Sequence, residues 1–221
     1  LAWGLVTLFF IRPRTANYDK VPEGGYRHLI IAWDVSPSMQ LDDGGIDLSK
    51  QKKRTRSQRG AKVLLSLFER IALDQIRISI VAFFTSAKPV VVDTHDLNVV
   101  KNILDDLPLD RAFDPGKTSI ISGIEESVKL AKDWKPKSTT LLIVSDGDTL
   151  PNTGLPNLPP SISKVLVAGV GDPRRGVFID GHMSRQNSRI LRQLAKRLGG
   201  EYVDVNQVQI PTSQIAEMAG I

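Results

Sequence analysis

Five oxygen-bearing side chains, in three separate segments of this 221-residue chain, have the types and spacing of a metal site. Asp34, Ser36 and Ser38 form a D-x-S-x-S sequence. Thr118 stands in the middle of the chain, and Asp146 is followed by a glycine. Hard oxygen ligands without sulfur or imidazole suit Mg²⁺, with Mn²⁺ or Ca²⁺ as alternatives. Two serines two residues apart can point at one ion, and the carboxylates can neutralise it through bound water. We therefore predict a divalent-cation site formed by these five residues.

Alternating apolar and amphipathic segments supply the elements that must bring these side chains together. The apolar runs predict strands over 28–33, 76–84, 88–93, 139–144, 163–170 and 201–205. Helical spacing predicts helices over 56–71, 97–107, 119–134, 188–198 and 209–219, with Gly199-Gly200 capping the fourth of these. This order is typical of a doubly wound, Rossmann-like α/β domain with a mainly parallel sheet and helices on both faces. Ligands of such folds gather at the carboxyl ends of strands, where the segments with Asp34 and Asp146 begin. Thr118 stands at the start of the helix at 119–134, and we expect the three loops to converge at one edge of the sheet.

The motif and its place after the strands resemble the von Willebrand factor type A domain over residues 27–205. That family's metal-ion-dependent adhesion site has a D-x-S-x-S, a distant Thr and a distant Asp, and all five positions match here. The resemblance implies that the serines and the threonine contact the metal directly or nearly so, while the aspartates act through water. It also implies that an acidic side chain of a partner protein fills the remaining metal position. Lys117 departs from the pattern, because many members have Gly there. A cation at this position could weaken metal binding or contact the partner's acid.

Helix capping is the alternative role for three of these residues. Asp34 and Ser36 follow a strand where a helical turn could begin, and Thr118 directly precedes the expected helix at 119–134. Side-chain oxygens of Asp, Ser and Thr commonly accept hydrogen bonds from the first free backbone N–H groups of a helix. In that case the three loops would need no metal.

The amino-terminal region points to one group of proteins within the type A family. Residues 1–11 are apolar throughout, and Arg12 and Arg14 follow them around a proline. We interpret residues 1–11 as the end of a transmembrane helix, 12–26 as a linker and 27–221 as the type A domain. This layout resembles the bacterial membrane-anchored Bat-type, or aerotolerance-associated, proteins, as do the sequences at 184–187 and 199–202. The resemblance implies an adaptor in the bacterial inner membrane that works with a MoxR-type AAA+ ATPase system. It leaves open on which side of the membrane the domain lies.

Two enzyme classes compete with this interpretation. Gly116-Lys117-Thr118 looks like the end of a P-loop, but Arg111 stands where the first glycine of that motif is needed, and no apolar strand precedes it. Asp34 follows a strand as a phosphorylated aspartate would, yet Ser36 occupies the place of the second aspartate of a haloacid-dehalogenase-like site. No G-x-S-x-G sequence is present. We therefore expect a binding domain and not an enzyme.

Composition and charge exclude several other classes of site. The chain has no cysteine, so it forms no disulfide, cysteine zinc site, iron–sulfur cluster or thiol nucleophile. Lys and Arg number 29 and Asp and Glu 24, and much of the excess lies in one run, KQKKRTRSQR, at residues 50–59. This run is either a solvated stretch leading into a helix or a surface for anionic lipid or nucleic acid. It contains no aromatic residue on which a base could stack, and no nucleic acid is expected as a partner.

Overall fold

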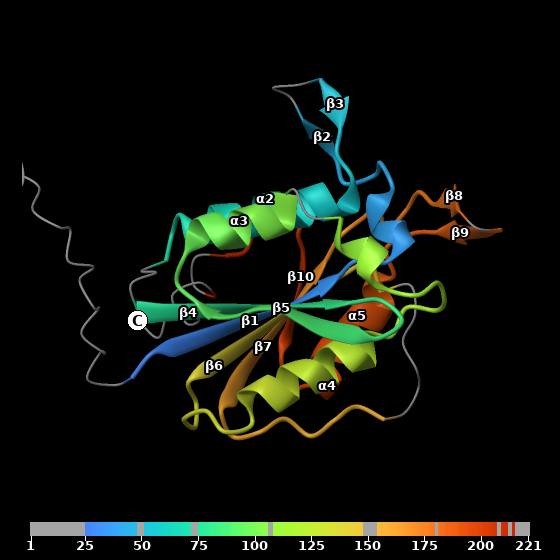
Figure 1. The fold of residues 1–221 in the computed structure, drawn as a ribbon. Coiled ribbons are helices and arrows are strands. Elements are labelled where there is room, and N and C mark those ends of the chain that lie inside the picture. The colour runs from blue at the N-terminus through green and yellow to red at the C-terminus, as the bar shows by residue number, and fades with distance from the viewer. Residues whose placement is uncertain are drawn as a thin grey trace, which may run out of the picture.

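A six-stranded β-sheet forms the centre of the computed structural model, which describes residues 25–47, 51–71, 75–105, 108–147, 154–179, 181–206, 209–211 and 214 (Figure 1). Its strands lie in the order β10-β7-β6-β1-β4-β5. Only β5 runs antiparallel to its neighbour, and the other pairs are parallel. The strands are β1 (Arg27–Asp34), β4 (Ile76–Phe83), β5 (Ala87–Thr94), β6 (Thr139–Ser145), β7 (Ile162–Gly169) and β10 (Glu201–Asp204). The mainly parallel α/β fold predicted from the sequence is confirmed.

Helices cover both faces of this sheet. One face carries α2 (Arg56–Phe68) and α3 (Leu97–Asp105), and the opposite face carries α4 (Ile120–Ala131) and α5 (Ser188–Arg197) (Figure 1). Two short 3-10 helices, η1 (Pro37–Gln40) and η3 (Leu109–Ala112), lie in the connections. This layered arrangement follows from the sequence, because each helix carries one apolar face that must be buried against the sheet.

Strand β1 contributes to both cores, because successive side chains of a strand point to opposite faces. Leu29, Ile31 and Trp33 pack with the α2 and α3 side, while Ile30 and Ala32 pack with the α4 and α5 side. All five are nearly or fully buried. Central β-strands of this kind read as unbroken apolar runs, and that run ends at the aspartate that begins the predicted metal site.

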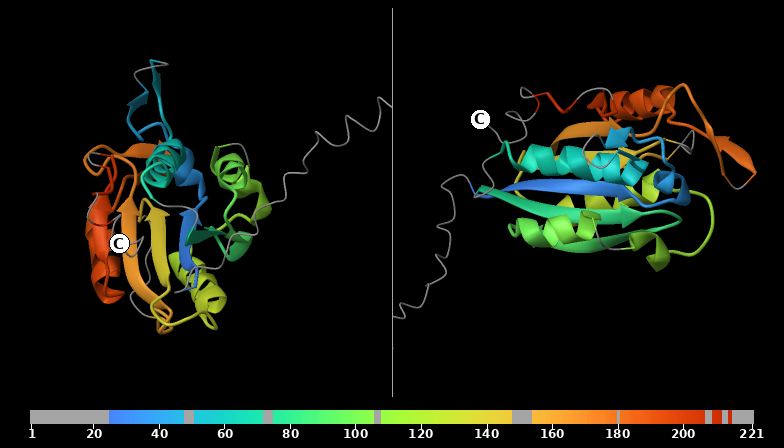
Figure 2. Two further views of the ribbon diagram at one scale, coloured as in Figure 1. Left: turned by 90° about the vertical axis from the view of Figure 1, so that its left-hand side faces the viewer. Right: turned by 90° about the horizontal axis from the view of Figure 1, so that it is seen from above.

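Two small hairpins lie beside the main sheet and were not predicted. They pair β2 (Ile46–Asp47) with β3 (Lys52–Lys53), and β8 (Val177–Ile179) with β9 (His182–Ser184). Figure 2 shows β8 and β9 reaching beyond the sheet at the end where β1 and β6 finish. Strands of two or three residues are too short to show a hydrophobic period, so the sequence offered no basis for them.

The remaining expected elements agree with the structure within three residues at each boundary. The final helix at 209–219 and the linker at 12–26 lie mostly outside the described residues, and the apolar segment 1–11 lies wholly outside them. Within the described ranges, no helix combines the length and apolar composition that crossing a bilayer requires.

Candidate metal centre

The ends of β1 and β6 place two of the predicted aspartates side by side. These strands are neighbours, with Trp33 opposite Val144, so Asp34 and Asp146 follow at the same edge of the sheet. Both side chains are fully buried. The hydroxyl of Ser145 donates to Oδ2 of Asp34 over 2.6 Å and links the two loops. The structure therefore brings these two carboxylates together at one edge of the sheet.

The serine loop turns its two hydroxyls toward each other. The Ser36 amide donates to Oδ1 of Asp34 at 2.9 Å, which closes the loop over the aspartate. Oγ of Ser36 lies 3.1 Å from Oγ of Ser38, and both residues are buried. Ser36 stands at the N-cap of η1, but its side chain makes no capping hydrogen bond. The two hydroxyls thus form a buried oxygen pair that the short helix does not use.

The third segment, which contains Thr118, lies at the same edge of the sheet, against the end of β4. The Ser119 amide donates to the carbonyl of Phe84, which follows β4, at 2.6 Å, and Phe83 is the register partner of Asp34. Ser119 is the N-cap of α4, since its hydroxyl accepts from the Ser122 amide. The capping alternative for Thr118 is therefore wrong. Thr118 lies one residue before the cap and is half-buried.

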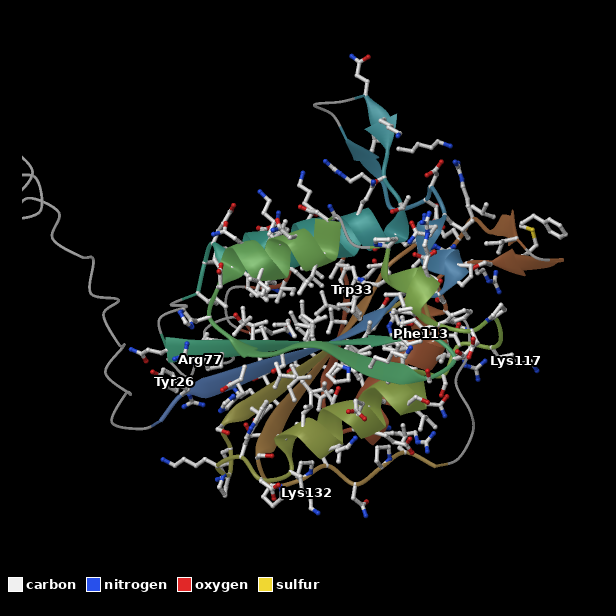
Figure 3. The ribbon with its side chains drawn as sticks, in the orientation of Figure 1. Tyr26, Trp33, Arg77, Phe113, Lys117 and Lys132 are labelled. Carbon is white, nitrogen blue, oxygen red and sulfur yellow. The ribbon has the colours of Figure 1, made fainter. Side chains whose placement is uncertain are left out.

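Lys117, the residue that departs from the family pattern, is exposed. Figure 3 places it at the outer side of the domain, at the sheet end where the site residues gather. Its ammonium group therefore lies on the solvent side of the Thr118 loop. This position suits contact with a partner's acid better than occupation of the buried site.

A buried arginine, Arg56, joins the site from the first turn of α2. It has no exposed surface. One guanidinium nitrogen donates to Oδ2 of Asp146 at 2.6 Å and to Oγ of Ser184 at 2.9 Å. The other two nitrogens bind both carboxylate oxygens of Asp43 at 2.7 and 2.9 Å. Arg56 therefore ties together the Asp146 loop, the loop after η1 and the hairpin β8–β9.

The local electrostatics favour a further cation. Burial, followed by the charge of Asp146, raises the pKa of Asp34 to about 7, because two carboxylates are crowded together away from water. Burial alone would lower the pKa of Arg56, but its hydrogen bonds and the charges of Asp43 and Asp146 outweigh that effect and raise it. Arg56 thus pairs with two aspartates, Asp43 and Asp146, and the carboxyl group of Asp34 adds to an excess of acidic groups in the cluster.

Comparison with known proteins gives matches among solved structures only. No protein-family model matches the sequence, and no curated protein matches it. An aerotolerance-related membrane protein from Bacteroides fragilis is 18% identical, with 88% of this chain and 98% of that chain covered and a TM-score of 0.62. The conserved hypothetical protein BatB from Bacteroides thetaiotaomicron is 17% identical, with 88% and 96% covered and a TM-score of 0.63. The manganese-loaded TRAP protein of Plasmodium vivax is 15% identical, with 88% and 73% covered and a TM-score of 0.54. These likenesses show the fold, which is that of a von Willebrand factor type A domain.

The donor set of this type A domain fits a hard divalent cation. The described residues contain no group of three or more His, Cys, Asp and Glu side chains that could form a carboxylate or imidazole cage. Both oxygens of Asp34 accept hydrogen bonds from the protein, and one oxygen of Asp146 accepts from Arg56. The hydroxyls of Ser36 and Ser38, hydrogen-bonded to each other over 3.1 Å, are further buried oxygens of the cluster. This division agrees with hydroxyls in direct contact and aspartates that act through water, which suits Mg²⁺.

Arg56 is the site residue of the type A domain that the sequence analysis missed, because it was counted as one charge of the basic run. Its position could have been found. A helix that follows a parallel strand runs back along the sheet, so its first turn lies near the carboxyl end of that strand. Thr55 and Gln58 form a capping box that fixes the start of α2 at Arg56. The first helical residue is therefore placed beside the metal loops.

The rest of the basic run 50–59 does not form one continuous surface in the part that the structure describes. Arg59 is half-buried, and its side chain donates to the carbonyls of Val205 and Asn206 at 2.6 and 3.3 Å. Only Lys52 and Lys53, on β3, are exposed cations in the described part of the run. Lys50 lies outside the described residues.

Proposed function

We infer that this type A domain is a metal-dependent protein-interaction module. Ser36, Ser38 and Thr118 would hold one Mg²⁺, with Asp34 and Asp146 neutralising it through water. The bound metal supplies a Lewis-acid position that an aspartate or glutamate of another protein can occupy. The observation that carries this proposal is the buried hydroxyl pair, 3.1 Å apart, in front of two fully buried carboxylates. A bound cation would let both carboxylates stay ionised, whereas burial without it raises the pKa of Asp34 to about 7.

The chain's own residues prepare this site in two ways. The hydrogen bonds from Ser145 and the Ser36 amide fix the carboxylate of Asp34, so its orientation does not depend on the metal. Arg56 does the same for Asp146. Ligands held by a surrounding set of hydrogen bonds lose little freedom when a metal binds. The proposal assigns no bond-making step to these residues, so the domain would bind a partner without turning over a substrate.

The wider cellular role rests on the resemblance to Bat-type proteins. It includes an anchor in the bacterial inner membrane through residues 1–11 and a partner within a MoxR-type AAA+ ATPase system. The Bacteroides fragilis neighbour is itself described as a membrane protein, which supports this setting. Identifying the partner protein would show on which side of the membrane the domain lies.

A pair of neighbouring variants separates metal binding from helix capping. In calorimetry with Mn²⁺ after dialysis against EDTA, we expect the parent protein to bind one ion. Thr118→Ala should weaken that binding at least about tenfold. Ser119→Ala should leave Mn²⁺ binding intact but lower the free energy of unfolding by about 1 kcal/mol, because it removes the cap of α4. A parent protein that gives no heat with Mn²⁺ or Mg²⁺, or a Thr118→Ala variant that binds like the parent, would refute the proposal.

A further inference from the structure

The hairpin β8–β9 presents apolar side chains to solvent next to the candidate metal centre. Phe178 and Met183 are directly opposite each other in its ladder, so their side chains share one face. They are 68% and 59% exposed, and Phe178 is the only aromatic residue among the exposed large hydrophobic residues of the described chain. The opposite face of the hairpin carries Val177, which is half-buried, and Ser184, which is fully buried. The hairpin therefore packs one face on the domain and leaves the apolar face uncovered.

The hairpin is fixed to the candidate metal centre by hydrogen bonds. Ser184 accepts from Arg56 through both its hydroxyl, at 2.9 Å, and its carbonyl, at 3.3 Å. The same arginine binds Asp146. Just past the hairpin, the Asn187 amide donates to the carbonyl of Asp146 at 2.7 Å. A protein that reaches the metal centre would therefore meet a hairpin held at a defined position beside it.

The apolar pair lies among exposed cations. Arg174 and Arg175 precede β8, Arg185 follows β9, and all three are exposed. The carboxylate of Asp172 is engaged locally, since it accepts from the amides of Arg174 and Arg175 at 2.7 and 3.1 Å. Aromatic residues, Met and Arg are enriched in protein–protein interfaces, and aromatic and Arg residues often carry most of their binding energy. The hairpin has this composition.

We propose that the outer face of β8–β9 is a second docking surface for the partner of the metal centre, and that it binds an acidic protein surface with an apolar recess. The part of this inference that gives the hairpin and the metal centre the same partner rests on the proposed function. A protein fits this face better than an anionic membrane does. The metal-centre loops also carry the exposed acids Asp42 and Asp114, which a uniformly negative bilayer would repel. A protein can place its own cations opposite them.

The test uses a phage-displayed library of random 12-residue peptides, selected on the immobilised protein in Mg²⁺. Selected peptides should combine Asp or Glu with aromatic or aliphatic residues. Their affinity, measured by fluorescence polarisation, should fall at least about tenfold for Phe178→Ser/Met183→Ser and for Arg174→Glu/Arg175→Glu. All four side chains project from the hairpin region into solvent, so a thermal melt should show both variants folded.

Matched controls remove the same chemistry elsewhere. Val92→Ser/Val99→Ser removes two other exposed apolar side chains, which are 47% and 39% exposed on β5 and α3. Lys101→Glu/Lys132→Glu reverses two exposed cations on α3 and just after α4; Figure 3 labels Lys132 on the α4 side. Both controls should bind the selected peptides like the parent.

The outcomes separate this inference from the metal proposal. Peptides that bind the hairpin variants as tightly as the parent would overturn the docking surface, even if Mn²⁺ binds. If the hairpin variants bound phosphatidylglycerol vesicles less well than the parent but bound the peptides equally, that result would also overturn the docking surface and would assign the hairpin to lipid. Hairpin-dependent peptide binding that survives EDTA, in a protein that gives no heat with Mn²⁺, would support the docking surface while refuting the metal centre.

Discussion

Charge balance around a single arginine defines this site at the scale of residues. Arg56 has no exposed surface, yet it contacts two aspartates and a serine from three separate segments of the chain. A buried guanidinium is tolerated only where its donors are satisfied and its charge is paired. Here the pairing runs both ways, because the buried Asp146 also depends on it. The arginine therefore supports the site whether or not a metal is bound.

Replacing Arg56 tests this dependence. We expect Arg56→Met to lower the free energy of unfolding by about 3–5 kcal/mol, because the carboxylates of Asp43 and Asp146 lose their buried counter-charge. Urea unfolding in the presence of EDTA measures the effect without a contribution from metal. Lys62→Ala, an exposed change on the same helix, should alter stability by less than about 0.5 kcal/mol. A loss below about 1 kcal/mol for Arg56→Met would contradict the role given to this residue.

Residue chemistry was predictable where it follows a strand directly. Asp34, Ser36, Ser38 and Asp146 were assigned to one sheet edge because parallel strands end together, and the structure places them there. Arg56 was missed because a charge in a basic run resembles any other solvated charge. Only its position in the first helical turn distinguishes it, and that information comes from the topology.

Glycines set the distance between helices and sheet at the scale of elements. Gly60 of α2 lies over Trp33, and a Cβ placed there would be 2.9 Å from the indole ring. Gly123 of α4 lies over Phe83 on the other face, where a Cβ would be 2.5 Å from Cδ1. Helices α2 and α4, which both start beside the site, thus approach the sheet through a residue without a side chain. This close approach also fixes where Thr118, which lies just before α4, can stand.

A methyl group at Gly123 should therefore be destabilising despite better helix propensity. Gly123→Ala gains up to about 1 kcal/mol of propensity. It must also displace the fully buried Phe83 ring, and overpacking of this kind costs about 1–3 kcal/mol. Thermal unfolding should show a lower midpoint than the parent. Glu125→Ala, an exposed change on α4, serves as the control and should leave the midpoint nearly unchanged. A Gly123→Ala protein more stable than the parent would show that α4 can move away from the sheet.

Regular elements were predictable from the sequence to different degrees. Buried strands such as β1 and β6 carry unbroken apolar runs, of five residues at Leu29–Trp33 and four at Leu141–Val144, and these runs predicted them. The edge strand β5 is half-buried to exposed along its length, and its neighbour β4 is continuous with it through a tight turn, which explains the antiparallel pairing. The hairpins β2–β3 and β8–β9 show no periodic pattern, and β8–β9 is held by a contact with another element. Ser184, for example, is fixed by Arg56.

At the scale of the whole molecule, the two ends of the sheet carry different kinds of contact. The carboxyl end carries the site, while the opposite end is closed by aromatic and charged contacts. There, His28 of β1 stacks on Trp134 with ring centroids 3.9 Å apart, and its Nδ1 lies 3.0 Å from a carboxylate oxygen of Asp93. Arg77, next to His28 on β4, lies over the ring of Tyr26 at 3.9 Å (Figure 3). This end has the role of holding the domain together.

The state of His28 should make the stability of the whole domain depend on pH. Burial lowers the pKa of His28 below its ordinary value of 6.5, and the charge of Arg77 acts in the same direction, while Asp93 opposes both. Below pH 6.5 the unfolded chain therefore binds a proton that the folded chain resists. The contribution of neutral His28 is fully present above its ordinary pKa and is lost as the pH falls below it.

Comparison with a non-titrating variant isolates this contribution. His28→Phe keeps a ring against Trp134 but carries no proton, and titrations far from His28, such as that of Asp34 at the other end of the sheet, are shared with the parent. Between about pH 7.5 and about pH 5, the parent should lose stability more steeply than the variant, by at most about 1.4 kcal/mol per pH unit. Urea unfolding at a series of pH values gives both slopes. Parallel slopes would mean that His28 takes up its proton equally in the folded and unfolded chain. In that case the stacked histidine end of the sheet would stabilise the domain through packing alone.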